Sequence, residues 1–197
     1  MKLQKINFSK TVTKLLYATT LMILFSCQGQ EQKSNRHKEE TPVSQIKPPS
    51  LDIHAATFMG NLEVVDQHIK AGSDLNKKDQ YGSTPLTIAA TFNKTEVALA
   101  LINAGADINM KSADGSTPLH TSAFFCRIEI VEALLEKGAD KTLRNNYGST
   151  PLESVSAPFS DVKNFYDQIS KDLGPLGFRL DYKYLETTRP LIADMLR

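Results

Sequence analysis

The chain has 197 residues, of which 41% are hydrophobic and 23% are charged, a composition typical of globular proteins. This length is enough for one domain of about 100 to 150 residues with additional segments. The formal net charge of +1 excludes the strongly basic surface that binding to nucleic-acid phosphates requires, so no nucleic acid is expected as a partner.

The first 26 residues have the features of an export signal. A basic stretch, residues 1–14, precedes an apolar run, residues 15–25, that is too short to span a bilayer permanently. The junction Leu24-Phe25-Ser26-Cys27 resembles the lipobox of bacterial lipoproteins, although Phe25 replaces the small residue usual at its position. This resemblance implies cleavage before Cys27, lipidation of its thiol, and a membrane-anchored protein facing the periplasm or the cell surface. The alternatives are an ordinary cleaved signal and an uncleaved one.

Residues 27–50 are predicted to be a disordered tether that begins at the lipidated Cys27. Residues 28–50 are polar and rich in proline. Such a segment contains too few apolar side chains to offset the conformational entropy that ordering would cost.

From residue 51 onward the sequence repeats with a period of 33 residues. The motif Gly-Ser-Thr-Pro-Leu occurs at residues 82–86, 115–119 and 148–152, and a second motif, Gly-(Ser or Ala)-Asp, occurs at residues 72–74, 105–107 and 138–140. Two different motifs that share one period indicate a repeat architecture, because a fixed period of this length is its sequence signature.

Each copy of the pattern predicts two helices. The threonines Thr84, Thr117 and Thr150 suit N-cap positions, and the proline after each suits the first helical position, where an N–H group is not needed. Apolar residues spaced three and four apart, as from Ile130 to Leu134, then predict the second helix. The glycine of the second motif is placed to end that helix in a left-handed conformation.

The pattern resembles the ankyrin-repeat family over about residues 51–157, most fully over residues 112–144. The resemblance implies an all-α solenoid of helix-turn-helix repeats with a C-terminal helical cap. The expected units are repeats at 51–78, 79–111, 112–144 and 145–173, and a cap at 174–197. Eight apolar residues of the C-terminal segment are expected to cover the open end of the solenoid: Leu176, Phe178, Leu180, Tyr184, Leu185, Leu191, Ile192 and Leu196.

The residues that could carry chemistry form no recognisable catalytic set. The four histidines are scattered, and no Cys or His pair has the spacing of zinc ligands. His120 matches the histidine of the family's Thr-Pro-Leu-His motif, which is usually structural, and Cys126 is interpreted as a small half-buried thiol. No catalytic residue, metal, cofactor or small-molecule substrate is therefore expected. An enzyme that uses Cys126 or the C-terminal segment is the less favoured alternative.

The resemblance also implies where a partner would bind, because ankyrin-repeat proteins present their turn tips and the ends of their first helices to partners. The large residues at these positions are Phe58, Met59, Tyr81, Phe92, Phe124, Phe125 and Tyr147. We expect them to form a partner-binding stripe along a concave groove. The alternative is that they pack between repeats or under the C-terminal segment.

These observations together predict a monomeric, membrane-tethered protein-protein interaction module that binds an unknown protein partner. A narrower alternative is an inhibitor or immunity protein that blocks a periplasmic enzyme or toxin.

Overall fold

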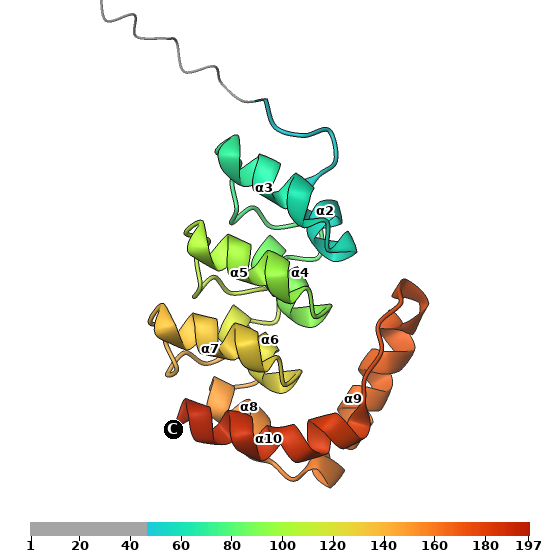
Figure 1. Cartoon of the computed structure of the whole chain (residues 1–197). Coiled ribbons are helices and arrows are strands. Elements are labelled where there is room, and N and C mark those ends of the chain that lie inside the picture. Colours follow the sequence, from blue (N-terminus) through green and yellow to red (C-terminus); the bar gives the residue numbers. More distant parts are fainter. Residues whose placement is uncertain (1–46) are drawn as a thin grey trace, which may run out of the picture. The chain divides into compact units, whose positions relative to one another are not determined.

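The computed structural model describes residues 47–197, which contain helices and no strands. The expected signal peptide, Cys27 and nearly all of the expected tether lie outside these residues. The helices, which Figure 1 labels, are α2 (Ile53–Met59), α3 (Leu62–Lys70), α4 (Pro85–Thr91), α5 (Thr95–Asn103), α6 (Pro118–Phe124), α7 (Ile128–Glu136), α8 (Pro151–Ser156), α9 (Phe159–Leu173), the 3₁₀ turn η1 (Gly174–Leu176) and α10 (Tyr182–Leu196). The all-α solenoid implied by the family resemblance is confirmed.

The Thr-Pro pairs begin the first helix of their repeats, as predicted. The hydroxyl groups of Thr84, Thr117 and Thr150 accept hydrogen bonds from the backbone N–H three residues later, and proline occupies the first turn in each case. In the first repeat, which has no such pair, the Asp52 carboxylate caps α2 instead. Each first helix therefore begins at the position that its local sequence specifies.

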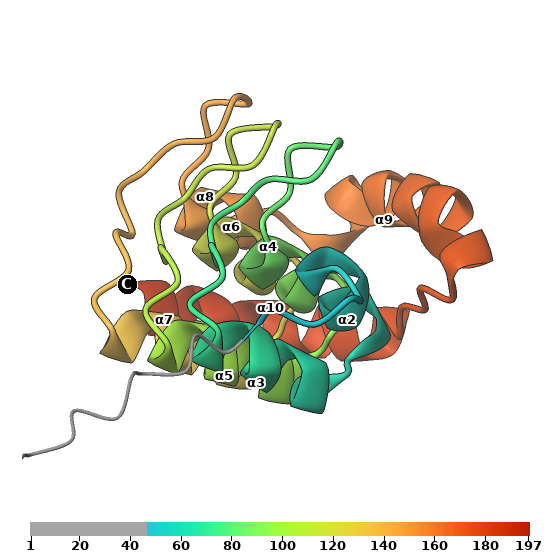
Figure 2. The same ribbon diagram turned by 90° about the horizontal axis from the view of Figure 1, so that it is seen from above.

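The helices stack in two layers. The first helices α2, α4, α6 and α8 pack on one another, as do the second helices α3, α5 and α7 (Figure 1). Fully buried alanines, such as Ala56 and Ala123, allow this close approach, while leucines such as Leu101 and Leu134 fill the space between the layers. The turns between repeats project side by side from one face (Figure 2).

Side-chain amides connect successive turns. The Oδ1 atom of Asn76 accepts a hydrogen bond from the Asp107 N–H at 2.7 Å, and Asn109 does the same for Asp140 at 2.9 Å. These bonds join residues 31 positions apart and repeat with the period of the sequence. They hold the turns in register.

The fourth repeat differs from the expected one. Its first helix, α8, pairs with α10, just as α2 pairs with α3, α4 with α5 and α6 with α7. The start of α10 lies beside the start of α7, where the Tyr184 hydroxyl donates to the Cys126 carbonyl, and its end approaches the loop after α7, where Lys141 donates to the Arg197 carbonyl. Residues 182–196 therefore complete the fourth repeat, whereas the expected boundary assigned residues 145–173 to it.

Helix α9 is an insertion between the two helices of the fourth repeat. It leaves the stack and lies to the side of the first helices (Figures 1 and 2). Of the residues expected to cover the open end, Phe178, Leu185, Ile192 and Leu196 are buried, and Leu180 is half-buried. Leu176, Tyr184 and Leu191 are exposed, so the prediction was wrong for these three.

The described residues belong to one compact unit, Ser44–Arg197, with its own hydrophobic core. Within residues 47–197 no helix combines the length and the apolar character needed to cross a bilayer.

Replacing Gly115 by alanine is expected to destabilise this unit more than replacing Gly105. Both glycines have positive φ, +76° and +86°, so alanine costs each site about 1 kcal/mol of backbone strain. At Gly115 the added Cβ would also lie 2.8 Å from the Asn146 nitrogen and closer still to its Oδ1, whereas at Gly105 it would meet no atom within 4 Å. Urea unfolding of residues 44–197 measures both losses, and equal losses would contradict the contact.

Candidate functional site

A groove of about 450 Å³ lies between α9 and the third and fourth repeats. Its α9 wall is apolar and consists of Val162, Phe165 and Ile169. Phe165 is 66% exposed, which is unusual for so large an apolar side chain. Lining residues from α6, α8 and the turns include Phe124, Asp114, Ser116, His120, Asn145, Tyr147, Ser149 and Glu153. The groove thus has one apolar wall and one mainly polar wall.

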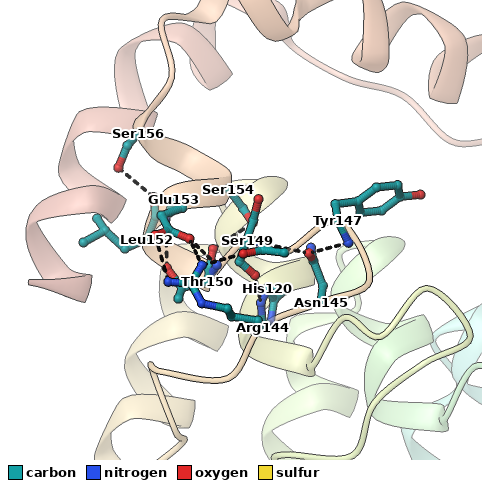
Figure 3. A network of polar contacts seen from close by, with 11 residues as sticks. His120, Arg144, Asn145, Tyr147, Ser149, Thr150, Leu152, Glu153, Ser154 and Ser156 are labelled. Atoms are coloured by element: carbon teal, nitrogen blue, oxygen red, sulfur yellow. Dashed lines mark hydrogen bonds and ion pairs between the residues drawn. The ribbon is translucent and has the colours of Figure 1, made fainter.

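His120 is a fixed, neutral part of the polar wall. The Thr117 N–H donates to its Nδ1 atom at 3.2 Å, so the proton of the imidazole is on Nε2, which donates to the Ser149 carbonyl at 2.9 Å. Burial lowers the pKa of His120, so the ring stays neutral at physiological pH. The structural role predicted for His120 fits this geometry, because the ring joins the third repeat to the fourth (Figure 3).

The side chains of Asn145 and Arg144 both bond to the turn that carries Tyr147, Arg144 through the Gly148 carbonyl. The Oδ1 atom of Asn145 accepts hydrogen bonds from the N–H groups of Tyr147, at 3.1 Å, and Ser149, at 3.0 Å. Figure 3 shows the Tyr147 ring pointing away from this turn. Tyr147 and its counterpart Tyr81 are both exposed, as expected of residues at the turn tips.

The charged residues that line the groove are both acidic. Burial would raise the pKa of the Asp114 carboxyl, but hydrogen bonds from Ser112 and Ser116 outweigh burial and lower the pKa below its usual value. The pKa of Glu153 is lowered by its hydrogen bond from Arg144, at 2.6 Å, and by the Thr150 N–H. No lysine or arginine lines the groove. Both carboxylates are ionised near neutral pH, but Arg144 pairs with Glu153, so Asp114 supplies the unpaired negative charge of the groove.

The predicted stripe of large residues is partly covered by the chain itself. The ring of Phe178, which follows η1, lies 5.8 Å from Phe92 and 5.4 Å from Phe125, and Tyr166 of α9 stacks on Phe124 at 4.5 Å. Phe125 is only 6% exposed, so the prediction that it faces outward was wrong. The reason is the inserted segment, which supplies the aromatic partners that a binding protein was expected to supply.

Phe124, Phe125 and Tyr147 of the stripe line the groove, whereas Phe58, Met59 and Phe92 lie apart from it. Phe58 and Phe92 are half-buried against each other, with ring centroids 4.7 Å apart, and Met59 is exposed. These three residues line a different pocket beside η1. The stripe is therefore divided between two depressions rather than forming one surface.

Cys126 lies beneath α10 and is buried. Burial raises the pKa of its thiol to about 11, so the nucleophilic thiolate is scarce at neutral pH. Its backbone has φ of 55°, like Asn93 at the matching position of the preceding repeat. These features fit a packing role. Among residues 47–197 no three His, Cys, Asp or Glu side chains gather as metal ligands.

Comparison with known protein families identifies the family to which this architecture belongs. A family model for ankyrin repeats matches residues 53–153 in three copies. The chain belongs to the ankyrin-repeat family. No curated protein matches it significantly. Ankyrin repeats are generally protein-protein interaction modules, which agrees with a groove that has apolar and polar walls.

Helix α9 is the part of this ankyrin-repeat protein that sequence reasoning missed as a site element. Val162, Phe165, Tyr166 and Ile169 have the three- and four-residue spacing of one apolar helix face. Only Tyr166 of these four is buried. One sequence signal could have identified α9 as an additional helix. The chain after Pro158 contains more helical sequence than the fourth repeat needs, since one repeat has only two helices.

Replacing Tyr166 by phenylalanine is expected to loosen the α9 wall. The Tyr166 hydroxyl donates to the Phe124 carbonyl at 2.6 Å and accepts from Arg189 Nη1 at 2.7 Å, and its removal leaves both groups unsatisfied. The loss should be about 1–3 kcal/mol in urea unfolding, with faster hydrogen exchange in α9. Tyr182→Phe is the control, because the 3.3 Å hydrogen bond of that hydroxyl joins it to Ser170, which is not a buried residue. Equal effects of the two substitutions would contradict the role of Tyr166.

Proposed function

We propose that this ankyrin-repeat protein binds a segment of a partner protein in the groove between α9 and the third and fourth repeats. The observation that carries the proposal is Phe165, an exposed aromatic ring on a wall that faces hydrogen-bonding groups. Aromatic anchors beside a polar rim are the usual source of binding energy at protein interfaces. Tyr147 adds a second exposed ring at the mouth of the groove.

The lining of the groove also indicates the chemistry of the partner segment. Val162, Phe165 and Ile169 complement an aliphatic or aromatic side chain. Asp114 and Glu153 complement a lysine or arginine, and no cation of the groove would repel one. Because Arg144 already pairs with Glu153, Asp114 is the carboxylate that is more available to a partner. The expected ligand is a segment in which a basic residue lies close to a large apolar one.

We further propose that the protein is an exported lipoprotein anchored at Cys27. The support is the sequence itself: a basic start, a short apolar run and a lipobox-like junction. Residues 28–50 would separate the lipid from the repeats and allow the groove to reach a partner at the membrane surface or in the periplasm. The site of action would then be the envelope.

A photoreactive amino acid in place of Phe165 is expected to cross-link the partner in cells that express the full chain. The matched control carries it in place of Leu191, which is also exposed but lies on α10 outside the groove. Mass spectrometry should map the cross-link to a partner peptide with adjacent basic and apolar residues. With that purified partner, Phe165→Ala should raise Kd about tenfold or more. The groove assignment fails if the two positions cross-link the same proteins equally.

The substitution Cys27→Ser is expected to release the protein from the membrane fraction, because no thiol remains to be acylated. Cys126→Ser serves as the control, since Cys126 is buried in the repeats and should leave the protein membrane-bound. The N-terminal mass of the wild-type protein should include acyl chains. An unmodified N-terminus would contradict the lipid anchor and would leave the groove proposal unaffected.

A further inference from the structure

A second pocket, also of about 450 Å³, lies at the ends of α2 and α4 and beside η1. Three cationic side chains line it: Lys94, Arg127 and Arg179. The other lining residues are Phe58, Met59, Phe92, Asn93, Leu176, Gly177 and Phe178, and none is acidic. The pocket therefore concentrates positive charge in a chain whose net charge is close to zero.

The structure gives these cations no carboxylate partner within residues 47–197. Arg127 donates through Nε and Nη2 to the carbonyls of Ala90 and Thr91, at 3.4 and 3.3 Å, and Arg179 donates through Nη1 to the carbonyls of Gly174 and Phe178. Carbonyl oxygens orient a guanidinium group but do not neutralise its charge. Burial lowers the pKa of Arg127, which shows that its charge is held at a desolvation cost that a bound anion would offset.

Acidic residues lie beside this pocket but do not line it. Glu129 and Asp181 line an adjoining depression together with Arg127 and Arg179, but neither forms an ion pair with them and neither lines this pocket. The helices α5 and α7 also begin here, and their N-cap residues, Lys94 and Arg127, make no side-chain cap. The positive ends of both helix dipoles add to the charge of the side chains, and Glu96 and Glu129 in the first turns offset part of this charge.

The rim of the pocket is apolar and open. Met59 is 62% exposed and Leu176 is 56% exposed, and they lie on two different elements, α2 and η1. A free anion would gain nothing from these two side chains. An anion carried on an amphiphile would gain from both, because its polar group can meet the cations while its apolar part covers the rim.

We propose that this pocket binds a phosphate group, and that its source is the headgroup of an acidic phospholipid. Lys94, Arg127 and Arg179 bind the phosphate oxygens, with the guanidinium groups offering paired N–H donors. Met59 and Leu176 contact the boundary between headgroups and acyl chains. The pocket would orient the repeats on a membrane surface and is independent of the partner-binding groove.

The test uses residues 44–197, which form a compact unit with its own core and carry no lipid anchor of their own. The purified unit is sedimented with vesicles of phosphatidylcholine alone or mixed with phosphatidylglycerol, and is separately titrated with inorganic phosphate while backbone NMR shifts are recorded. The test variant is Lys94→Ala combined with Arg179→Ala. The control is Lys70→Ala combined with Lys137→Ala, which changes the net charge equally at exposed positions outside the pocket.

We expect the unit to bind the vesicles that contain phosphatidylglycerol and not those of phosphatidylcholine alone. The affinity for the mixed vesicles should fall roughly thirtyfold in the test variant and less than about threefold in the control. Met59→Ser combined with Leu176→Ser should weaken vesicle binding while leaving the response to inorganic phosphate unchanged. Phosphate binding at Lys94 and Arg127 without vesicle binding would assign the pocket to a soluble phosphate compound. Equal losses in the two charge variants, or binding to neither probe, would overturn the proposal.

Discussion

The buried side chain of Arg189 determines the arrangement of the C-terminal part of this protein. It is only 2% exposed, and its guanidinium group donates to the Tyr166 hydroxyl at 2.7 Å and to the Ala157 carbonyl at 3.0 Å. The Tyr166 hydroxyl in turn donates a hydrogen bond to the Phe124 carbonyl. Burial raises the pKa of Tyr166 to about 12, so the phenol keeps the proton that this bond needs. One cation thus joins α10, α9, the end of α8 and the end of α6.

This connection is what allows an ankyrin repeat to accept a long insertion without losing its second helix. Helix α10 packs against α8 in the position that α7 takes against α6, although α9 and η1 separate α8 from α10 in the sequence. The cost is a buried positive charge without a carboxylate, compensated by the Ala157 carbonyl, the Tyr166 hydroxyl and the Tyr166 ring 5.9 Å away. The result is a helix fixed beside the repeats, with Phe165 directed to the groove and Tyr166 to the core.

The sequence predicted the repeats well because their determinants are local. Thr150 caps a helix through its own neighbours, and the period locates the same position in each copy. The pairing of α8 with α10 is not local: residues 159–173 and 182–196 both have helical apolar spacing, and Pro190, which lies inside α10, is a residue that disfavours a helix interior. What selects α10 is the contact of Leu185 and Ile192 with the repeats, which no spacing rule reveals.

The large residues at the ends of the first helices are partly covered by the C-terminal segment, which was the alternative to an open partner-binding stripe. They form part of a continuous row of aromatic contacts that runs from Phe58 through Phe92, Phe178 and Phe125 to Phe124 and Tyr166. The middle of the row is covered by the inserted segment. Its two ends open into the cationic pocket at Phe58 and the acidic groove at Phe124. The insertion therefore divides what would be one apolar surface into a pocket lined by three cations and a groove whose unpaired charge is the Asp114 carboxylate.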